Sequence, residues 1–240
     1  MRLKQLVFTL EKMIKEISSL RFQPKKKQFL HRNVPYFSQW ESKDLVKDII
    51  ARTVSAQDDP LWRKSGAKTK REYELWSWNG CGMACLKMIL AFILKKEIPL
   101  VKLGTVCQKY GGYLPKNNGL KGLFYKPFLT CVKREFGLNA TIIAPMVVSD
   151  IIQELEKGNF VIASVHPDIR THTAKPSQKG GHLVLMLGYD MEQQSFSLHN
   201  PSGTTSKTQE YFKIPFTTFC NFFAYRGIAI SISTFKILSC

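Results

Sequence analysis

The sequence has few cysteines for its length, and none of them forms a C-x-x-C pair. Six cysteines are spread over 240 residues, at positions 81, 85, 107, 131, 220 and 240. Disulfide-stapled secreted domains are much richer in cysteine, so the pattern excludes such a scaffold and favours a reducing compartment, the cytoplasm. Cys81 and Cys85 are four residues apart, but no second pair of cysteines or histidines follows at short spacing. We therefore expect neither a metal nor a cofactor.

The sequence also lacks an apolar run long enough to cross a bilayer. Its first residues resemble a signal peptide, but Glu11 and Lys12 interrupt the apolar run and no small-residue cleavage site follows. Residues 3–21 are therefore predicted to form an amphipathic helix, and residues 22–33 a basic linker. We expect one domain to follow over residues 34–240. Export stays an open alternative.

Acidic residues are scarce. The chain has 18 aspartates and glutamates against 35 lysines and arginines, and its net charge is +17. Such a surface favours nucleic acid, anionic membranes and acidic partners. The basic residues are spread along the chain, however, and no nucleic-acid-binding motif accompanies them. We interpret them as solvated faces with non-specific affinity for polyanions. Tight, steeply salt-dependent binding of RNA or DNA would instead indicate a nucleic-acid-associated protein.

Apolar residues are plentiful, at 44% of the chain, and their spacing changes near residue 160. Helical periodicity predominates before that point, and alternating or β-branched segments follow it. This order predicts an α+β fold in which a helical part packs against an antiparallel sheet. The predicted helices cover 43–52, 82–95, 123–136 and 149–157, the last with Ser149 as its cap. The predicted strands cover 140–143, 160–165, 183–189, 195–199, 209–214 and 225–232, with an extended run over 34–40 and loops over 105–120.

One cysteine lies at the start of the helix predicted over 82–95. Cys81 stands between Gly80 and Gly82, which leave its sulfur uncrowded. Unpaired N–H groups and the positive end of the helix dipole stabilise a thiolate at this position. The pattern therefore predicts a nucleophilic cysteine with a lowered pKa. A buried packing role is the alternative, because free cysteines are among the most buried residue types.

A histidine and an asparagine are predicted to lie together at one end of the sheet. If the hairpin after residue 189 turns near residue 191, His182 at the start of one strand faces Asn200 at the end of the next. An amide that orients an imidazole makes a base able to activate a thiol. Gln39 follows the extended run over 34–40 and offers an amide donor of the kind used in oxyanion holes.

The motifs around these residues resemble those of papain-like cysteine peptidases, in particular the bacterial group related to bacteriocin leader peptidases that cut after double glycine. The likeness extends over roughly residues 34–230. It implies a papain-like fold, a peptide or protein substrate, and a Cys-His-Asn site. In that site Cys81 would be the nucleophile, His182 the general base, Asn200 the orienting residue and Gln39 the oxyanion donor. The matching segments are Val34–Gln39, Cys81–Leu90, Gly181–Asp190 and Asn200–Gly203.

Two features depart from the leader-peptidase pattern. In those enzymes the glutamine precedes the cysteine by a few residues, whereas Gln39 lies 42 residues upstream of Cys81. Their third residue is usually the aspartate of an Asp-Pro pair, and here Asn200 precedes Pro201; papain itself uses asparagine. We predict a thiol hydrolase that cleaves a peptide or amide bond through an acyl-enzyme. A papain-like domain that transfers the acyl group to an amine, or binds peptides without turnover, is the alternative.

Overall fold

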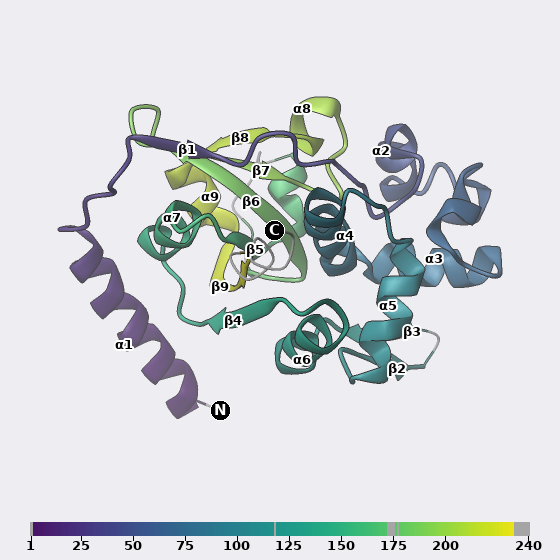
Figure 1. Ribbon diagram of the computed structural model, residues 1–240, viewed down its shortest axis with the longest axis horizontal. Coiled ribbons are helices and arrows are strands. Elements are labelled where there is room, and N and C mark those ends of the chain that lie inside the picture. Colours follow the sequence, from purple (N-terminus) through teal and green to yellow (C-terminus); the bar gives the residue numbers. More distant parts are fainter. Residues whose placement is uncertain (1, 118, 172–175, 177, 233–240) are drawn as a thin grey trace.

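A computed structural model describes residues 2–117, 119–171, 176 and 178–232. Helices pack beside and over an antiparallel sheet, which confirms the predicted α+β fold (Figure 1). Five helices precede the central strands and gather on one side of the sheet: α2 (Val46–Ile50), α3 (Lys70–Asn79), α4 (Cys81–Leu94), α5 (Leu100–Lys109) and α6 (Tyr125–Phe136). Short 3-10 turns lie at Lys43–Leu45, Ala56–Asp58 and Trp62–Ser65.

The central helix of this group is α4. Every residue from Gly82 to Ala91 is buried, as expected for a helix that is mostly apolar around its circumference. Lys87 is the charged residue in this stretch, and it pairs with Glu41 at 3.9 Å and with Glu97 at 3.8 Å. The helix predicted over 82–95 is therefore confirmed. In the described part of the chain no single helix is long and apolar enough to span a membrane; α3 and α4 reach that length and composition only together, as a pair bent by 87°.

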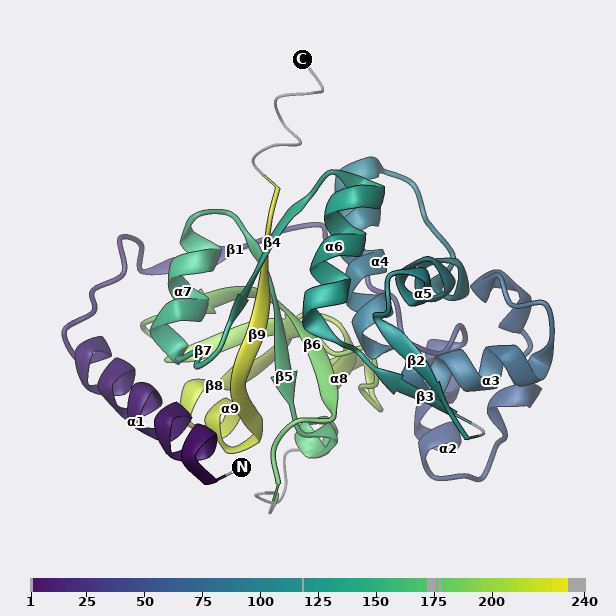
Figure 2. The same ribbon diagram turned by 90° about the horizontal axis from the view of Figure 1, so that it is seen from below.

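Within the described residues, seven strands form one antiparallel sheet. Figure 2 shows β4, β9 and β5 side by side. A separate hairpin joins β2 (Tyr113–Lys116) to β3 (Gly119–Gly122). The order across the large sheet is β4 (Asn139–Ile143), β9 (Phe223–Ser231), β5 (Phe160–Val165), β6 (His182–Asp190), β7 (Ser195–His199) and β8 (Phe212–Pro215), and β1 (Gln28–Leu30) also pairs with β6.

The two faces of the sheet support two separate cores. Along β5, Ile162 packs toward α4, α5 and α6, whereas Val161 and Ala163 pack on the opposite face. This alternation follows from the two-residue period of a strand. The opposite face is covered by α7 (Val148–Glu156) and α9 (Phe216–Phe222). Because both faces are covered, β5 and most of β6 are buried throughout. The chain also forms a short α8 (Ser206–Gln209).

Two segments form elements that the sequence patterns did not predict. The charged stretch before Cys81 contains α3, in which Thr69 Oγ1 accepts a hydrogen bond from Glu72 N at 3.1 Å. This is a capping arrangement. Its charged residues face solvent while Tyr73 and Trp76 are buried. The region over 105–120, predicted as loops, contains the end of α5 and most of the β2–β3 hairpin.

Several predicted boundaries are wrong. The basic linker over 22–33 contains β1, which pairs with β6. The extended run over 34–40 joins no strand ladder. Ser149 does not cap α7; Val147 holds that position, and its N–H donates to the Asp150 carboxylate at 2.8 Å. The strand predicted over 209–214 begins later, because residues up to Gln209 belong to α8.

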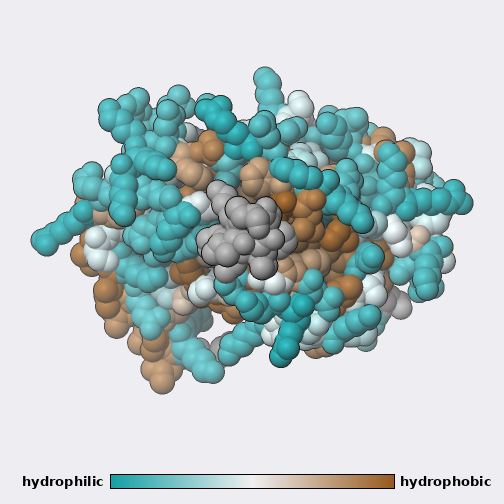
Figure 3. All heavy atoms as spheres, viewed as in Figure 1, coloured by the Kyte–Doolittle hydropathy of each residue, from teal (hydrophilic) through white to brown (hydrophobic). Residues whose placement is uncertain are grey.

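The N-terminal helix α1 (Arg2–Ser19) confirms the predicted helix and points its apolar face away from the domain. Its polar side meets the body: Lys15 Nζ donates to Pro145 O at 2.9 Å and pairs with Asp150 at 3.1 Å. Brown spheres mark the apolar face at the lower left of Figure 3. The side chains on that face are 46–82% exposed: Leu3, Leu6, Val7, Leu10, Met13, Ile14, Ile17 and Leu20.

Candidate active site

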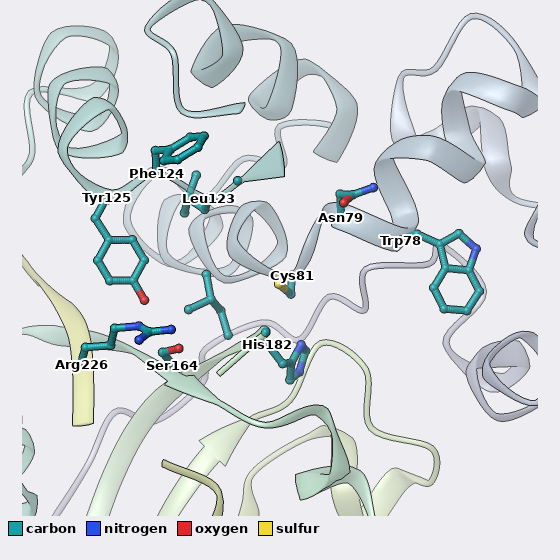
Figure 4. Close-up of a pocket in the computed structure, with 12 residues that line it drawn as sticks. Trp78, Asn79, Cys81, Leu123, Phe124, Tyr125, Ser164, His182 and Arg226 are labelled. Carbon is teal, nitrogen blue, oxygen red and sulfur yellow. The ribbon is translucent and has the colours of Figure 1, made fainter. Parts of the chain in front are cut away.

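A cavity of about 350 Å³ lies between the start of α4 and the sheet (Figure 4). It brings together Cys81 and His182, which are far apart in the sequence. The cavity therefore joins the two residues that sequence reasoning singled out for the chemical step. Its walls come from the α3–α4 junction, the segment before α6, and strands β5, β6 and β9, and the lining residues are Trp78, Asn79, Cys81, Gly122, Leu123, Phe124, Tyr125, Ser164, Gly181, His182, Leu183 and Arg226.

Cys81 is the first residue of α4, directly after the sharp bend from α3. A Cβ on Gly80 would lie 2.7 Å from Trp76 O, so the bend needs a glycine. A Cβ on Gly82 would lie 2.9 Å from Leu123 Cδ2. The second glycine therefore lets the cavity wall approach the helix, in addition to leaving room at the sulfur. Cys81 itself is half-buried.

The pKa of Cys81 differs from the prediction. Burial raises the pKa of the Cys81 thiol, because a thiolate loses hydration inside the cavity. The N–H groups of Leu183 and Gly82 and the positive charge of Arg170 act in the opposite direction, but their combined effect is smaller. The predicted lowering of the pKa by the helix N-terminus is therefore wrong. Burial thus favours the neutral thiol over the thiolate.

His182 and Asn200 are neighbours, as the hairpin argument predicted. His182 Nε2 lies 2.8 Å from Asn200 Oδ1, and both side chains are buried. The assumed register was wrong, because the turn spans residues 191–194 and the β6–β7 pairing shifts between Met186 and Gly188. Asn200 reaches the histidine because it lies just beyond the end of β7, where the chain turns.

The hydrogen bonds fix the tautomer of His182. Ser202 N, which can only donate, donates to Asn200 Oδ1 at 3.1 Å, so this atom is the amide oxygen. His182 Nε2 must then donate to it, which leaves Nδ1 without a proton and able to accept one. Burial lowers the pKa of His182 to about 3, with a further contribution from the Arg170 charge. The resting imidazole is therefore neutral.

Ser202 and Arg170 belong to this network and were missed from the sequence. The Ser202 hydroxyl lies 3.0 Å from His182 Nε2 and accepts a hydrogen bond from Arg170 Nε at 2.8 Å. Arg170 ends the 3-10 turn Pro167–Arg170 after β5. The sequence did carry an indication of Ser202, since it lies two residues after Asn200 in the turn sequence Asn-Pro-Ser-Gly. Nothing in the sequence indicated Arg170.

Gln39 does not line the cavity. Its Nε2 donates to Ser77 O at 2.8 Å, one turn before Cys81, and its Oε1 is buried without a partner among the described residues. The side chain therefore lies behind the α3–α4 junction. The Nε2 atom of Gln39 carries two N–H groups, and one of them donates to Ser77 O.

The segment around Gln39 holds the loop that carries Asn200. Tyr36 Oη donates to Asn200 O at 2.9 Å. Ser38 Oγ and Gln39 N both donate to Pro201 O, each at 2.9 Å. These bonds explain why an extended run with no strand partner is ordered, and they couple the N-terminal motif to the position of the asparagine.

Comparison with known families agrees with this arrangement. The Peptidase C39-like family matches residues 31–229. The chain belongs to this family. Its members are papain-like cysteine peptidases related to the bacteriocin-processing peptidases. The fold is also similar to a crystal structure from Bacillus anthracis, provisionally described as a C39-like peptidase. That structure has a TM-score of 0.51 and 14% sequence identity, and the match covers 86% of this chain and 98% of the other. No curated protein matches the chain.

Proposed function

We propose that this member of the C39-like family is an active cysteine peptidase that hydrolyses a peptide bond through an acyl-enzyme. The observation that carries the proposal is the shared cavity of Cys81 and His182, with His182 Nε2 bonded to Asn200 at 2.8 Å. That bond orients the ring and leaves Nδ1 free to accept a proton. Family membership supports a peptide substrate.

The neutral resting state sets the order of proton transfer. Since burial disfavours both the thiolate and the imidazolium, Cys81 passes its proton to His182 Nδ1 as the sulfur attacks the carbonyl carbon. The imidazolium then gives this proton to the leaving amine. In the second half, His182 takes a proton from water, the hydroxide attacks the thioester, and the carboxylic acid product leaves with Cys81 again as a thiol.

The oxyanion needs hydrogen-bond donors close to the sulfur. The N–H groups at the first turn of α4 have no intrahelical partners, and Cys81 is the first residue of that helix. We assign the Cys81 N–H to the oxyanion, with the second amide N–H of Gln39 as its partner. The hydrogen bond from Gln39 to Ser77 at 2.8 Å holds the amide at the α3–α4 junction but outside the lining of the cavity, so the part assigned to Gln39 stays a prediction.

Thiol alkylation tests whether the site is assembled. Iodoacetamide labelling over a range of pH, read by mass spectrometry at each cysteine, should modify Cys81 faster than Cys220. Both thiols are half-buried, so Cys220 is a matched control. In a His182→Ala variant the Cys81 rate should fall to the Cys220 rate, because the base is gone. A Cys81 rate no higher than that of Cys220 in the wild type would contradict an activated thiol.

Turnover tests the reaction itself. A peptide library incubated with the wild type should yield new N-termini, and Cys81→Ala should yield none while retaining its fold by circular dichroism. Cleavage by Cys81→Ala at the wild-type rate would rule out the assignment of the nucleophile. If Cys81 is alkylated rapidly but peptides bind without being cleaved, the peptide-binding alternative is favoured. If the acyl group is transferred to an added amine, the acyl-transfer alternative is favoured.

A further inference from the structure

A cationic side chain lies in the same cavity as the nucleophile and has no part in the chemical step. Arg226 of β9 lines the cavity with Tyr125 and Ser164. Figure 4 shows these three polar groups together on one side, with Cys81 and His182 on the other. Burial raises the pKa of the Tyr125 phenol, and the neighbouring Ser164 hydroxyl and the charge of Arg226 act in the opposite direction. Ser164 is 3% exposed. These donors converge at one end of the cavity.

The backbone is bent so that Arg226 reaches this place. Between two paired positions, the single residue Ser164 of β5 faces three residues of β9, Ala224 to Arg226. Tyr225 in the middle has a φ of 53°, an uncommon conformation for a residue with a side chain. Bulges of this kind redirect side chains next to active sites. The irregularity therefore aims Arg226 at the cavity.

A glycine leaves the space that the guanidinium occupies. Gly180, with a φ of 100°, lies against the guanidinium, and a Cβ there would be 2.7 Å from Arg226 Nη2. The positive φ is a conformation that glycine adopts without strain. The guanidinium thus lies beside the Gly180 backbone and the side chain of Tyr125, and Arg226 as a whole is exposed.

The charge of Arg226 is not compensated within the described residues. It forms no ion pair there, and no aspartate or glutamate is among the described residues that line the cavity. At neutral pH it is the one lining side chain there that carries a full charge. A guanidinium beside a tyrosine and a serine hydroxyl is a donor set suited to a carboxylate.

We propose that Arg226, Tyr125 and Ser164 form a carboxylate-binding subsite, which makes the preferred substrate a peptide with an acidic group next to the bond that is cut. The substrate preference in this inference rests on the proposed peptidase function. The carboxylate comes from an aspartate or glutamate side chain or from the C-terminus of the peptide. Both sources present the same carboxylate to the subsite, and peptides that carry only one of them distinguish the two.

A pair of small alkylating reagents tests the subsite without a known substrate. Iodoacetate is an anion and iodoacetamide is neutral, and both alkylate a thiol with loss of iodide. The ratio of their rates at Cys81 should fall about fivefold in Arg226→Gln, and Arg226→Lys should retain most of the wild-type ratio. Arg21→Gln is the control, since it removes the same charge from an exposed position after α1. An unchanged ratio in Arg226→Gln would overturn the subsite.

Peptide cleavage distinguishes the source of the carboxylate. Paired peptides with glutamate or glutamine near the cut, each with a free or an amidated C-terminus, should show which carboxylate the wild type selects. Arg226→Gln should lose that selection and still cleave. Wild-type cleavage that ignores both kinds of carboxylate would reject the subsite and keep the peptidase. A wild-type Cys81 that reacts with both reagents no faster than Cys220 would reject the peptidase, and the ratio of these slow rates would still report on Arg226.

Discussion

At the residue scale, His182, the proposed base, contacts more partners than the Cys-His-Asn set contains. Ser202 is fully buried and contacts His182, Asn200 and Arg170 at 3.0, 3.3 and 2.8 Å. Its hydroxyl therefore connects the Arg170 guanidinium to the imidazole of His182. We regard Ser202 and Arg170 as positioning residues. Ser202 acts through a hydrogen bond and Arg170 through its charge, and substitutions separate these two effects.

Ser202→Ala removes a hydrogen bond and keeps the charge of Arg170. Activity should fall about tenfold, the size expected for one lost hydrogen bond in the transition state, and the pH profile of Cys81 alkylation should keep its position. Arg170→Gln removes the charge that favours the thiolate, so the same profile should move to higher pH. The measurement is the rate of iodoacetamide labelling against pH. Identical profiles for both variants would contradict an electrostatic role for Arg170.

At the scale of elements, periodicity predicted α1 and α4 but not what each helix packs against. All of α4 from Gly82 to Ala91 is buried, whereas the apolar face of α1 is exposed. The spacing of apolar residues along a helix indicates that one face is apolar. Whether another element covers that face depends on the tertiary structure. The pairing of β6 with β7 was predictable from sequence, because two strands joined by a short turn have few alternatives to pairing with each other.

The parts of the site that were not predicted depend on local irregularities. Ser202 contacts His182 because the chain turns just after the end of β7, and Arg226 reaches the cavity because β9 bulges at Tyr225. A strand pattern with period two carries no signal of either irregularity. The raised pKa of Cys81 was not predicted, because the position at a helix N-terminus says nothing of the desolvation that burial of the thiol adds.

The contrast between α1 and α4 predicts different costs for similar substitutions. Ile89→Ala in α4 should lower the free energy of unfolding by about 2–5 kcal/mol, because it opens a cavity among fully buried neighbours. Leu10→Ala in α1, where the side chain is 59% exposed, should change it by less than about 0.5 kcal/mol. Urea denaturation measures both values. Equal losses would mean that the apolar face of α1 is covered in solution.

At the scale of the whole molecule, folding buries three imidazoles in their neutral form: His31, His182 and His199. In His199, Nδ1 accepts from Tyr211 N at 3.0 Å and Nε2 lies 3.1 Å from Val34 O, so the ring has no free position for a second proton. Burial lowers the pKa of His199 to about 4. In the unfolded chain these groups titrate near 6.5. The unfolded state therefore binds more protons than the folded state in mild acid.

This difference predicts acid destabilisation with a definite sign. Stability is fully present above pH 6.5 and falls as the pH drops toward the folded pKa values of about 4 for His199 and about 3 for His182. His199 alone should contribute a loss of about 3 kcal/mol between pH 7 and pH 4. Urea denaturation at a series of pH values measures the slope.

His199→Gln separates titration from structure. Glutamine keeps one donor and one acceptor and does not titrate, so the variant should be less stable than the wild type at pH 7 and should lose less stability on acidification. The slope that remains belongs to His31 and His182, and the latter is the proposed general base. A wild-type unfolding free energy that stays constant from pH 7 to pH 4 would show that these imidazoles accept protons without unfolding. The neutral resting state assigned to the base would then be wrong as well, and Cys81 and His182 would be free to form an ion pair before the substrate arrives.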